Sequence, residues 1–302
     1  RAHARSEASN GRPRPRAAEV RACFKAIELS GGFMARLATY VSGCGGATSI
    51  VALHGVTDNG PSLAGIAQRW NGERRVVLVD SLGHGLSPRL TDGELADPFG
   101  ASVEAAIDVV EEQAAYAASG KVALLGHSMG GAIATAAAAA RPELVEALVL
   151  EDPAWLTEEQ AGAYKAGARA EIARLDRIAA NPADGIQEAV NDHPSRAVGE
   201  LAAWASAKGQ VDRALVAAGA VGLTVPRTQL AAEIAVPCLL MTGDQPGALF
   251  TEEAIASILA VGNPLLRATT VAGAGHCIRR DQPEAFYRAV EAFLGSLPSS
   301  EA

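Results

Sequence analysis

The segment LLGHSMGGA, residues 124–132, decides the fold, because it places Ser128 between glycines that lie two positions away on each side. An apolar run, VALL, precedes the segment, and an alanine-rich stretch typical of a helix follows it. A sharp turn between a strand and a helix leaves no room for side chains at Gly126 and Gly130. The segment therefore predicts a buried strand, a tight turn that exposes the Ser128 hydroxyl, and a helix.

A serine hydroxyl becomes a useful nucleophile only when a base removes its proton and a third group orients that base. His276 is the predicted base, because it follows the last predicted strand in VAGAGH, where glycines let the imidazole turn toward the strand ends. Asp244, at the end of the preceding strand in LLMTGD, is the predicted acid. Asp152 and Glu151, which close an earlier strand in LEDPAW, are the alternative acids.

Acyl transfer also needs two hydrogen-bond donors for the oxyanion, usually backbone amides. The segment LHGVTDNG, residues 53–60, is a strand end followed by a turn, and it offers the amide of Val56. The second predicted donor is the amide of Met129, directly after the serine. We interpret His54 as a brace for this turn and His127 as a residue that packs beneath the serine.

Short apolar runs alternate with amphipathic segments, a pattern that predicts an α/β fold with a mostly parallel sheet flanked by helices. The predicted strands are residues 34–41, 49–55, 76–80, 121–127, 147–152, 237–244 and 267–273. The first two should pair antiparallel across the glycine-rich GCGG turn. The predicted helices are residues 61–70, 101–119, 130–140, 252–261 and 282–295.

One interval, residues 153–232, separates two consecutive strands by a series of helix-like segments. It predicts a helical cap, called the lid below, inserted into a core formed by residues 20–152 and 233–302. Trp155, at the lid entry, is a candidate residue of the substrate pocket. Residues 1–19 are rich in arginine and proline and hold little that a core could bury, so we expect a disordered tail.

The composition of the chain argues against several classes of function. The net charge of -8 and the pI near 5.3 argue against binding to nucleic acid or to an anionic membrane. No apolar run reaches the roughly 18 residues that a membrane helix requires. The cysteines show neither zinc-ligand nor disulfide-framework spacing, so we expect no metal and a cytoplasmic protein with free thiols; they are Cys23, Cys44, Cys238 and Cys277.

The motifs LHG, DSLGHGLS, GHSMGG and GAGH, in this order and with a lid before Asp244, resemble the α/β-hydrolase superfamily over the chain from about residue 20. The resemblance implies Ser128 as nucleophile, His276 as base, Asp244 as acid and the Val56 and Met129 amides as oxyanion donors. It implies no cofactor. A serine at this position disfavours haloalkane dehalogenases and epoxide hydrolases, which need a carboxylate there.

The favoured function is hydrolysis of a small-molecule carboxylic ester or lactone through an acyl-enzyme intermediate. A C-C bond hydrolase and a cofactor-free haloperoxidase or perhydrolase are alternatives within the same fold. A ligand-binding receptor on a hydrolase scaffold is the alternative from another class, since a fold alone does not decide function. The oligomeric state stays open at this point.

Overall fold

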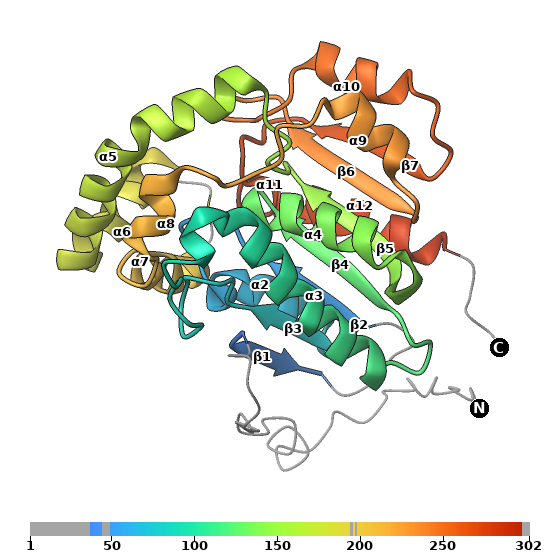
Figure 1. Cartoon of the computed structure of the whole chain (residues 1–302), viewed down its shortest axis with the longest axis horizontal. Helices are drawn as coiled ribbons and strands as arrows, with labels where there is room; N and C mark the ends of the chain where they lie inside the picture. Colours follow the sequence, from blue (N-terminus) through green and yellow to red (C-terminus); the bar gives the residue numbers. More distant parts are fainter. Residues whose placement is uncertain (1–36, 44–48, 194–195, 197, 298–302) are drawn as a thin grey trace, which may run out of the picture.

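A computed structural model describes residues 37–43, 49–193, 196 and 198–297, which form a seven-stranded sheet in the order β1-β3-β2-β4-β5-β6-β7 (Figure 1). The strands are β1 (Thr39–Ser42), β2 (Ser49–Leu53), β3 (Val76–Val79), β4 (Val122–His127), β5 (Val145–Glu151), β6 (Cys238–Gly243) and β7 (Leu266–Val271). Strands β2 to β7 are parallel, and β1 is antiparallel to its neighbour. The predicted α/β fold is confirmed. The expected tail, residues 1–19, lies outside the described residues.

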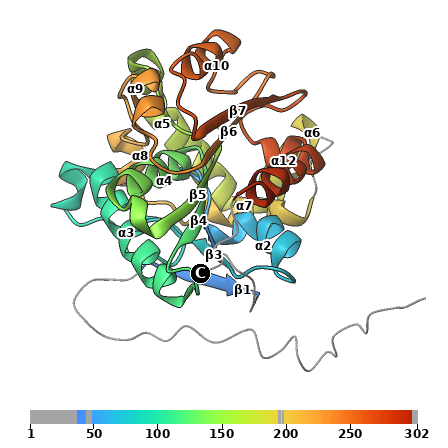
Figure 2. The same cartoon turned by 90° about the vertical axis from the view of Figure 1, so that its right-hand side faces the viewer.

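Helices cover both faces of the sheet (Figure 2). One face carries α3 (Pro98–Tyr116), α4 (Met129–Ala140), α9 (Arg227–Glu233) and α10 (Glu252–Leu259). The other face carries α2 (Ala64–Trp70), α11 (Ile278–Asp281) and α12 (Pro283–Gly295). Short 3-10 turns join these elements at η2 (Gly60–Leu63), η3 (Glu94–Ala96) and η4 (Pro142–Leu144).

The central strands carry continuous apolar runs because both of their faces are buried. Along β4, Val122 and Leu124 pack with α3 and α4, whereas Ala123 and Leu125 pack with α2 and α12. Successive side chains of a strand point to opposite faces, so the side chains of a continuous apolar run pack into two separate cores. This explains why these runs lack the alternating pattern of a strand with one solvated face.

The first strand pairs differently from the prediction. β1 lies antiparallel to β3, with Thr39 opposite Val79, and does not touch β2. Both edges of β2 are occupied by parallel neighbours, β3 and β4, so the outer edge of β3 is the place left for β1. The predicted antiparallel pairing of residues 34–41 with 49–55 is therefore wrong, and residues 34–36 and 44–48 lie outside the described part.

The interval between β5 and β6 is helical, as its sequence predicts. It contains α5 (Glu158–Ala180), α6 (Pro182–Asp192), η5 (Val198–Glu200), α7 (Leu201–Ala207), α8 (Arg213–Ala218) and α9. Helices α5 to α8 gather at one end of the sheet in Figure 1. The lid backbone there bonds to the loop after β3, since the Asp212 N–H donates to the Gly83 carbonyl at 2.7 Å. Residues of this interval therefore contact a loop at the carboxyl end of a parallel strand.

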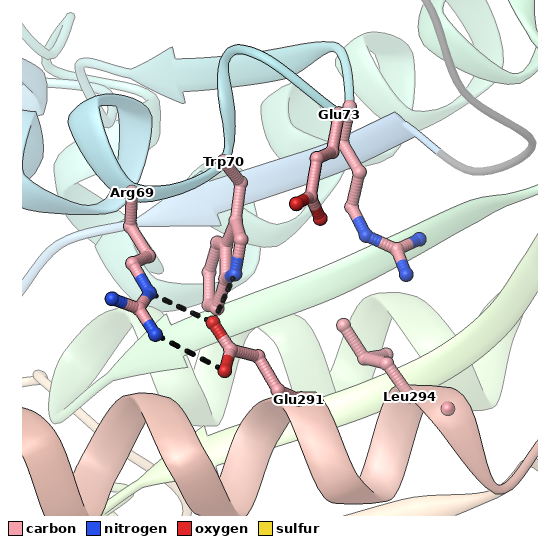
Figure 3. A pocket seen from close by; sticks show the side chains of 7 residues that line it. Arg69, Trp70, Glu73, Glu291 and Leu294 are labelled. Atoms are coloured by element: carbon pink, nitrogen blue, oxygen red, sulfur yellow. Dashed lines mark hydrogen bonds and ion pairs between the residues drawn. The ribbon is translucent and has the colours of Figure 1, made fainter. Parts of the chain in front are cut away.

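A cavity of about 540 Å³ lies between α2 and α12, on the face of the sheet that these helices cover (Figure 3). The Arg69 guanidinium and the Trp70 indole N–H both donate to the Glu291 carboxylate, at distances of 2.8 to 3.2 Å. These groups satisfy one another, so the cluster joins α2 to α12. In the described part of the chain, every helix is too short or too polar to span a bilayer.

Candidate active site

Ser128 stands at the turn between β4 and α4, in a backbone conformation that side chains rarely adopt, with φ 53° and ψ −119°. A Cβ on Gly126 would lie 2.3 Å from the Gly130 carbonyl oxygen, and one on Gly130 would lie 2.3 Å from that of Leu53. The steric reason predicted for the two glycines is thus confirmed. Such a conformation persists only where the surrounding structure holds it.

Neighbouring strands hold the turn in place. The Ser128 N–H donates to the Glu151 carbonyl at 3.0 Å, and the Ser128 carbonyl accepts from the Ala154 N–H at 2.8 Å. The Gly130 N–H donates to the His54 carbonyl at 3.0 Å. Residues after β2 and β5 therefore fix the serine from both sides.

His276 lies in the loop between β7 and α11, and its Nδ1 donates to Asp152 Oδ2 over 2.6 Å. The imidazole is partly exposed and lines the same pocket as Ser128, whereas the Asp152 side chain is completely buried. Because Nδ1 carries the proton toward the carboxylate, Nε2 is the nitrogen left to accept a proton. The structure thus brings together a serine, a histidine and a carboxylate.

Asp152 follows β5 directly and has a positive φ of 41°. Its Oδ1 accepts from the Thr242 hydroxyl at 2.6 Å, and its Oδ2 accepts from the Leu249 N–H at 2.9 Å in addition to His276. Three donors on one buried carboxylate fix its direction.

Asp244, the predicted acid, does not contact His276. Its side chain is exposed in the turn after β6, where Oδ1 accepts from the Gly273 N–H at 2.7 Å and from Gln245 Nε2 at 2.8 Å. These bonds lower its pKa and cap a surface turn. The expected pairing of Asp244 with His276 is wrong, and the alternative Asp152 occupies that position. Both residues satisfy the chain order of serine, acid and histidine, so sequence order alone could not separate them.

Glu151, the other alternative acid, has a different partner. Its two oxygens accept from the Arg279 backbone N–H and from Arg279 Nη1, both at 2.7 Å, and both side chains are buried. This pair anchors the start of α11, three residues after His276. Glu151 therefore contributes to the position of the His276 loop without touching the imidazole.

His127 packs beneath the serine turn, as predicted. Its ring lies 4.8 Å from the His276 ring, and its Nε2 is 3.0 Å from the His276 carbonyl oxygen. Burial holds the pKa of His127 well below its usual range, so the ring is neutral and Nε2–H donates. His127 thus fixes the backbone of His276. Apart from the position of His127 next to Ser128, no local pattern predicts this contact.

The turn after β2 presents the amide of Val56 beside the serine. The Gly55 carbonyl accepts from the Asp58 N–H at 3.0 Å and from His54 Nδ1 at 2.8 Å, while His54 Nε2 accepts from the Ser81 N–H at 3.0 Å. Burial lowers the pKa of His54 to about 3, which keeps this arrangement neutral. In a planar trans peptide the N–H points opposite to the carbonyl, so the Val56 N–H faces away from these donors.

The amide of Met129 is the second predicted oxyanion donor. Met129 is the first residue of α4, and the first N–H groups of a helix have no partner within the helix. The pocket wall includes Gly55, Val56 and Ser128, and Met129 follows Ser128 directly in the chain.

The loop after β3 supports this arrangement. The Asp80 carboxylate accepts from the Gly60 N–H at 2.6 Å, the Tyr40 hydroxyl at 2.8 Å and the Leu86 N–H at 2.8 Å. His84 is buried, and its Nε2 lies 2.5 Å from the Val56 carbonyl oxygen. Asp80 and His84 thus contact the turn after β2, which borders the pocket.

The pocket that holds Ser128 and His276 has a volume of about 520 Å³. One part of its wall is largely apolar and comes from the lid entry, α5, the segment after α8 and the loop after β6; it includes Ala154, Leu156, Ala163, Tyr164, Val221 and Leu249. Another part is polar and charged, with Thr57, Asp58, Glu171, Arg196 and Arg280. The site therefore has an apolar wall for one part of a substrate and a charged wall for another.

Trp155 does not line this pocket. Its ring is fully buried against Phe250, and its indole N–H donates to the Thr135 hydroxyl at 3.0 Å. It joins the lid entry to α4, so its prediction as a pocket residue is wrong. Trp204 of α7 is the tryptophan that lines the pocket.

Among the described residues, one group combines potential metal ligands: His127, Glu151 and Cys277, with ligand atoms within 4.8 Å of one another. Arg279 Nη1 already donates to Glu151, and it lies 3.3 Å from Cys277 Sγ. Burial raises the pKa of Cys277 to about 11, so the sulfur stays a thiol. The Arg279 guanidinium thus lies where a metal ion would bind. A protonated thiol is also a poor metal ligand, so these three residues do not suit a metal ion.

A family model described as the alpha/beta hydrolase family matches residues 50–289, which is most of the chain. The chain therefore belongs to the alpha/beta hydrolase family and shares its fold of a mostly parallel sheet flanked by helices.

The relatives that match this chain are named for different activities. Lipase LipV of Mycobacterium tuberculosis is 38% identical over 112 residues, which cover 37% of this chain and 40% of the lipase. The match thus spans less than half of that protein. The 2-(acetamidomethylene)succinate hydrolase of Mesorhizobium japonicum is 26% identical over 253 residues, 80% of this chain and 86% of the relative.

A solved structure supports the same fold. The crystal structure of E-2-(acetamidomethylene)succinate hydrolase matches with a TM-score of 0.66 and 23% identity, covering 86% of this chain and 95% of the other.

Proposed function

We propose that the protein is a serine hydrolase that cleaves a carboxylic ester or lactone through an acyl-enzyme intermediate. The observation that carries the proposal is the 2.6 Å contact between His276 Nδ1 and the buried Asp152 carboxylate, with Ser128 on the wall of the same pocket. In this proposal Ser128 is the nucleophile, His276 the base and Asp152 the acid that orients it.

The reaction begins when Ser128 Oγ attacks the substrate carbonyl and its proton passes to His276 Nε2. The imidazolium that forms is stabilised by the Asp152 side chain, which accepts a hydrogen bond from its other nitrogen. The Val56 and Met129 amides donate to the oxyanion of the tetrahedral intermediate. Collapse of the intermediate breaks the bond to the alcohol oxygen, which takes the proton from Nε2.

Water then enters the second half of the reaction. His276 removes a proton from the water, whose oxygen attacks the acyl carbon, and the second tetrahedral intermediate collapses to a carboxylic acid and a free Ser128 hydroxyl. No step needs a cofactor. A pocket of about 520 Å³ suits a small or medium-sized substrate.

A second candidate is hydrolysis of another bond in a substrate that bears a carboxylate. Two observations favour it: the relative that matches 80% of this chain is named a succinate derivative hydrolase, and Arg196 and Arg280 line the pocket. The same Ser128 and His276 would act, since both reactions begin with attack on a carbonyl group.

The test is hydrolysis of p-nitrophenyl esters, from acetate to decanoate, together with several lactones and half-esters of succinate. We expect wild type to turn over part of this panel and Ser128→Ala to lose about 10⁶-fold in kcat, the loss typical of a triad without its nucleophile. Ser257→Ala, which removes an exposed serine of α10, is the matched control and keeps the wild-type rate.

Other outcomes would redirect the proposal. Substantial activity in Ser128→Ala would remove the nucleophile assignment. Turnover of succinate half-esters alone would support ester hydrolysis with a requirement for a carboxylate on the substrate, whereas silence across the whole panel would favour the second candidate. Stoichiometric binding of panel compounds without product release would favour a receptor on a hydrolase scaffold, the alternative from another class.

A further inference from the structure

A buried lysine of the lid contacts the turn that carries Val56. Lys208 follows α7 directly, and its side chain is completely buried. Its ammonium donates to the Thr57 carbonyl at 2.7 Å, the Thr57 hydroxyl at 3.1 Å and Asp58 Oδ1 at 2.8 Å. An ammonium has three N–H donors, and the three acceptors of this turn use all of them.

These contacts continue to the predicted oxyanion donor through two peptide groups. In the peptide that joins Thr57 to Asp58, the carbonyl accepts a hydrogen bond from Lys208. The N–H of the same peptide donates to the Gly55 carbonyl, 3.0 Å away. The peptide that joins Gly55 to Val56 then points its N–H the opposite way, because trans peptides are planar. Hydrogen bonds in such a chain polarise one another, so a charge at one end strengthens the donor at the other.

We propose that Lys208 is a positioning residue for the oxyanion site, which fixes and polarises the Val56 N–H through the Thr57–Asp58 and Gly55–Val56 peptides. The inference rests on the proposed function, since Val56 serves as a donor only if Ser128 attacks a carbonyl. It makes the donor dependent on the lid, because the charge that orients the turn comes from α7.

Neighbouring contacts tie the same part of the lid to the same loops. Asn59 Nδ2 donates to Gln210 Oε1 at 2.8 Å, and the Arg89 guanidinium donates to the Gln210 carbonyl. The Asp212 N–H donates to the Gly83 carbonyl. Residues 208–212 are thus held against the turns after β2 and β3, and Lys208 supplies the charged contact among them.

The surroundings of Lys208 determine how it responds to pH. Asp58 and His54 face it from the turn after β2, Arg280 from α11, and Glu171 and Arg174 from α5. The Trp204 ring of its own helix lies 4.6 Å from Nζ.

Burial lowers the pKa of Lys208 to about 8, although Asp58 opposes this shift. A neutral amine has two N–H donors, so above this pH one of the three acceptors loses its bond. The effect of Lys208 on stability has the opposite direction to the expected loss of the hydrogen bond. Between pH 8 and the usual lysine pKa of 10.5, the unfolded chain binds more protons than the folded chain. The contribution of this group to the free energy of unfolding therefore increases as the pH rises. A fall of kcat in that window therefore reports on positioning and not on unfolding.

The test compares wild type with Lys208→Met and with Lys165→Met, which changes an exposed lysine of the same lid. At pH 7 we expect Lys208→Met to lose about 10- to 100-fold in kcat with KM changed less than about threefold, below the full loss of an oxyanion donor. Lys165→Met keeps wild-type values. Hydrogen exchange of the Asp58 amide, measured without substrate, should be faster in Lys208→Met alone.

Lys208→Arg keeps the charge and covers the case in which Lys208→Met does not fold. Wild type should lose kcat above pH about 8, whereas Lys208→Arg keeps its kcat there because a guanidinium stays protonated. An unchanged kcat in folded Lys208→Met, or the wild-type alkaline fall in Lys208→Arg, would overturn the proposal. If wild type turns over no ester, the proposed function fails, and the exchange of Asp58 still reports whether Lys208 orders the turn.

Discussion

The turns after β5 and β6 each present an aspartate at the carboxyl end of a buried parallel strand, yet the two side chains have different surroundings. Asp152, after β5, is fully buried and accepts from Thr242, Leu249 and His276. Asp244, after β6, is exposed and accepts from Gly273 and from its neighbour Gln245.

The comparison shows that the environment of a carboxylate, and not its place in the chain, decides which strand end provides the partner of His276. β5 lies between β4, which bears the serine, and β6, whose turn reaches the solvent. β6 contributes through Thr242 inside the strand, where the hydroxyl orients Asp152. A buried, fully bonded carboxylate holds an imidazole in one orientation, which an exposed turn residue does not.

The largest effect expected from this comparison is on turnover. Asp152→Asn should lower kcat by about 10⁴-fold, because an amide neither orients the required tautomer nor stabilises an imidazolium. Asp244→Asn should stay within about twofold of wild type, since surface substitutions away from the site have small effects. The measurement is kcat on the best substrate of the ester panel at pH 7.

Circular dichroism and thermal unfolding of both variants serve as the control for folding. A folded Asp244→Asn that loses activity while Asp152→Asn retains it would reverse the comparison and return the acid role to the turn after β6.

The second effect concerns stability at Glu151, the residue beside Asp152. Glu151→Gln and Arg279→Met should each lower the free energy of unfolding by about 3 to 5 kcal/mol, because each leaves a buried charge without its partner. Urea unfolding measures this change. The double variant should recover part of the loss, since it removes both charges. Losses that simply add in the double variant would show that the two side chains do not act as a pair.

The smallest effect tests the contribution of β6. Thr242→Val removes the hydroxyl that donates to Asp152 Oδ1 and should lower kcat by about tenfold, the value of one hydrogen bond to a charged group. Thr270→Val, at an exposed position of β7, is the matched control. Equal kcat values for the two variants would mean that Leu249 and His276 suffice to orient the carboxylate.

Most of the fold follows from local sequence. The apolar runs of β4 and β5 and the glycines around Ser128 predict strand, turn and helix, because only a small residue fits where Gly126 approaches Gly130. The position of β1 could not be predicted in this way. Strand order depends on which edges remain free after β2, β3 and β4 have paired, and this is a property of the assembled sheet.

The residues of the site also differ in how far local sequence predicts them. Ser128 and His276 stand in short glycine-containing motifs, so the sequence alone is enough to predict both residues. The partner of His276, the place of Trp155 and the contacts of Lys208 depend on residues far away along the chain. No local sequence pattern predicts these three features, because such contacts form only when the strands and the lid have packed.

The sequence by itself determined the α/β architecture, the strained serine turn and the histidine, since steric limits and apolar patterning act over a few residues. Only the tertiary structure decided that Asp152 and not Asp244 faces His276, and that the lid bonds to the turn of Val56 through Lys208. The physical reason is burial: the strength of a carboxylate or an ammonium as a partner depends on which groups exclude water around it, and those groups come from every part of the chain.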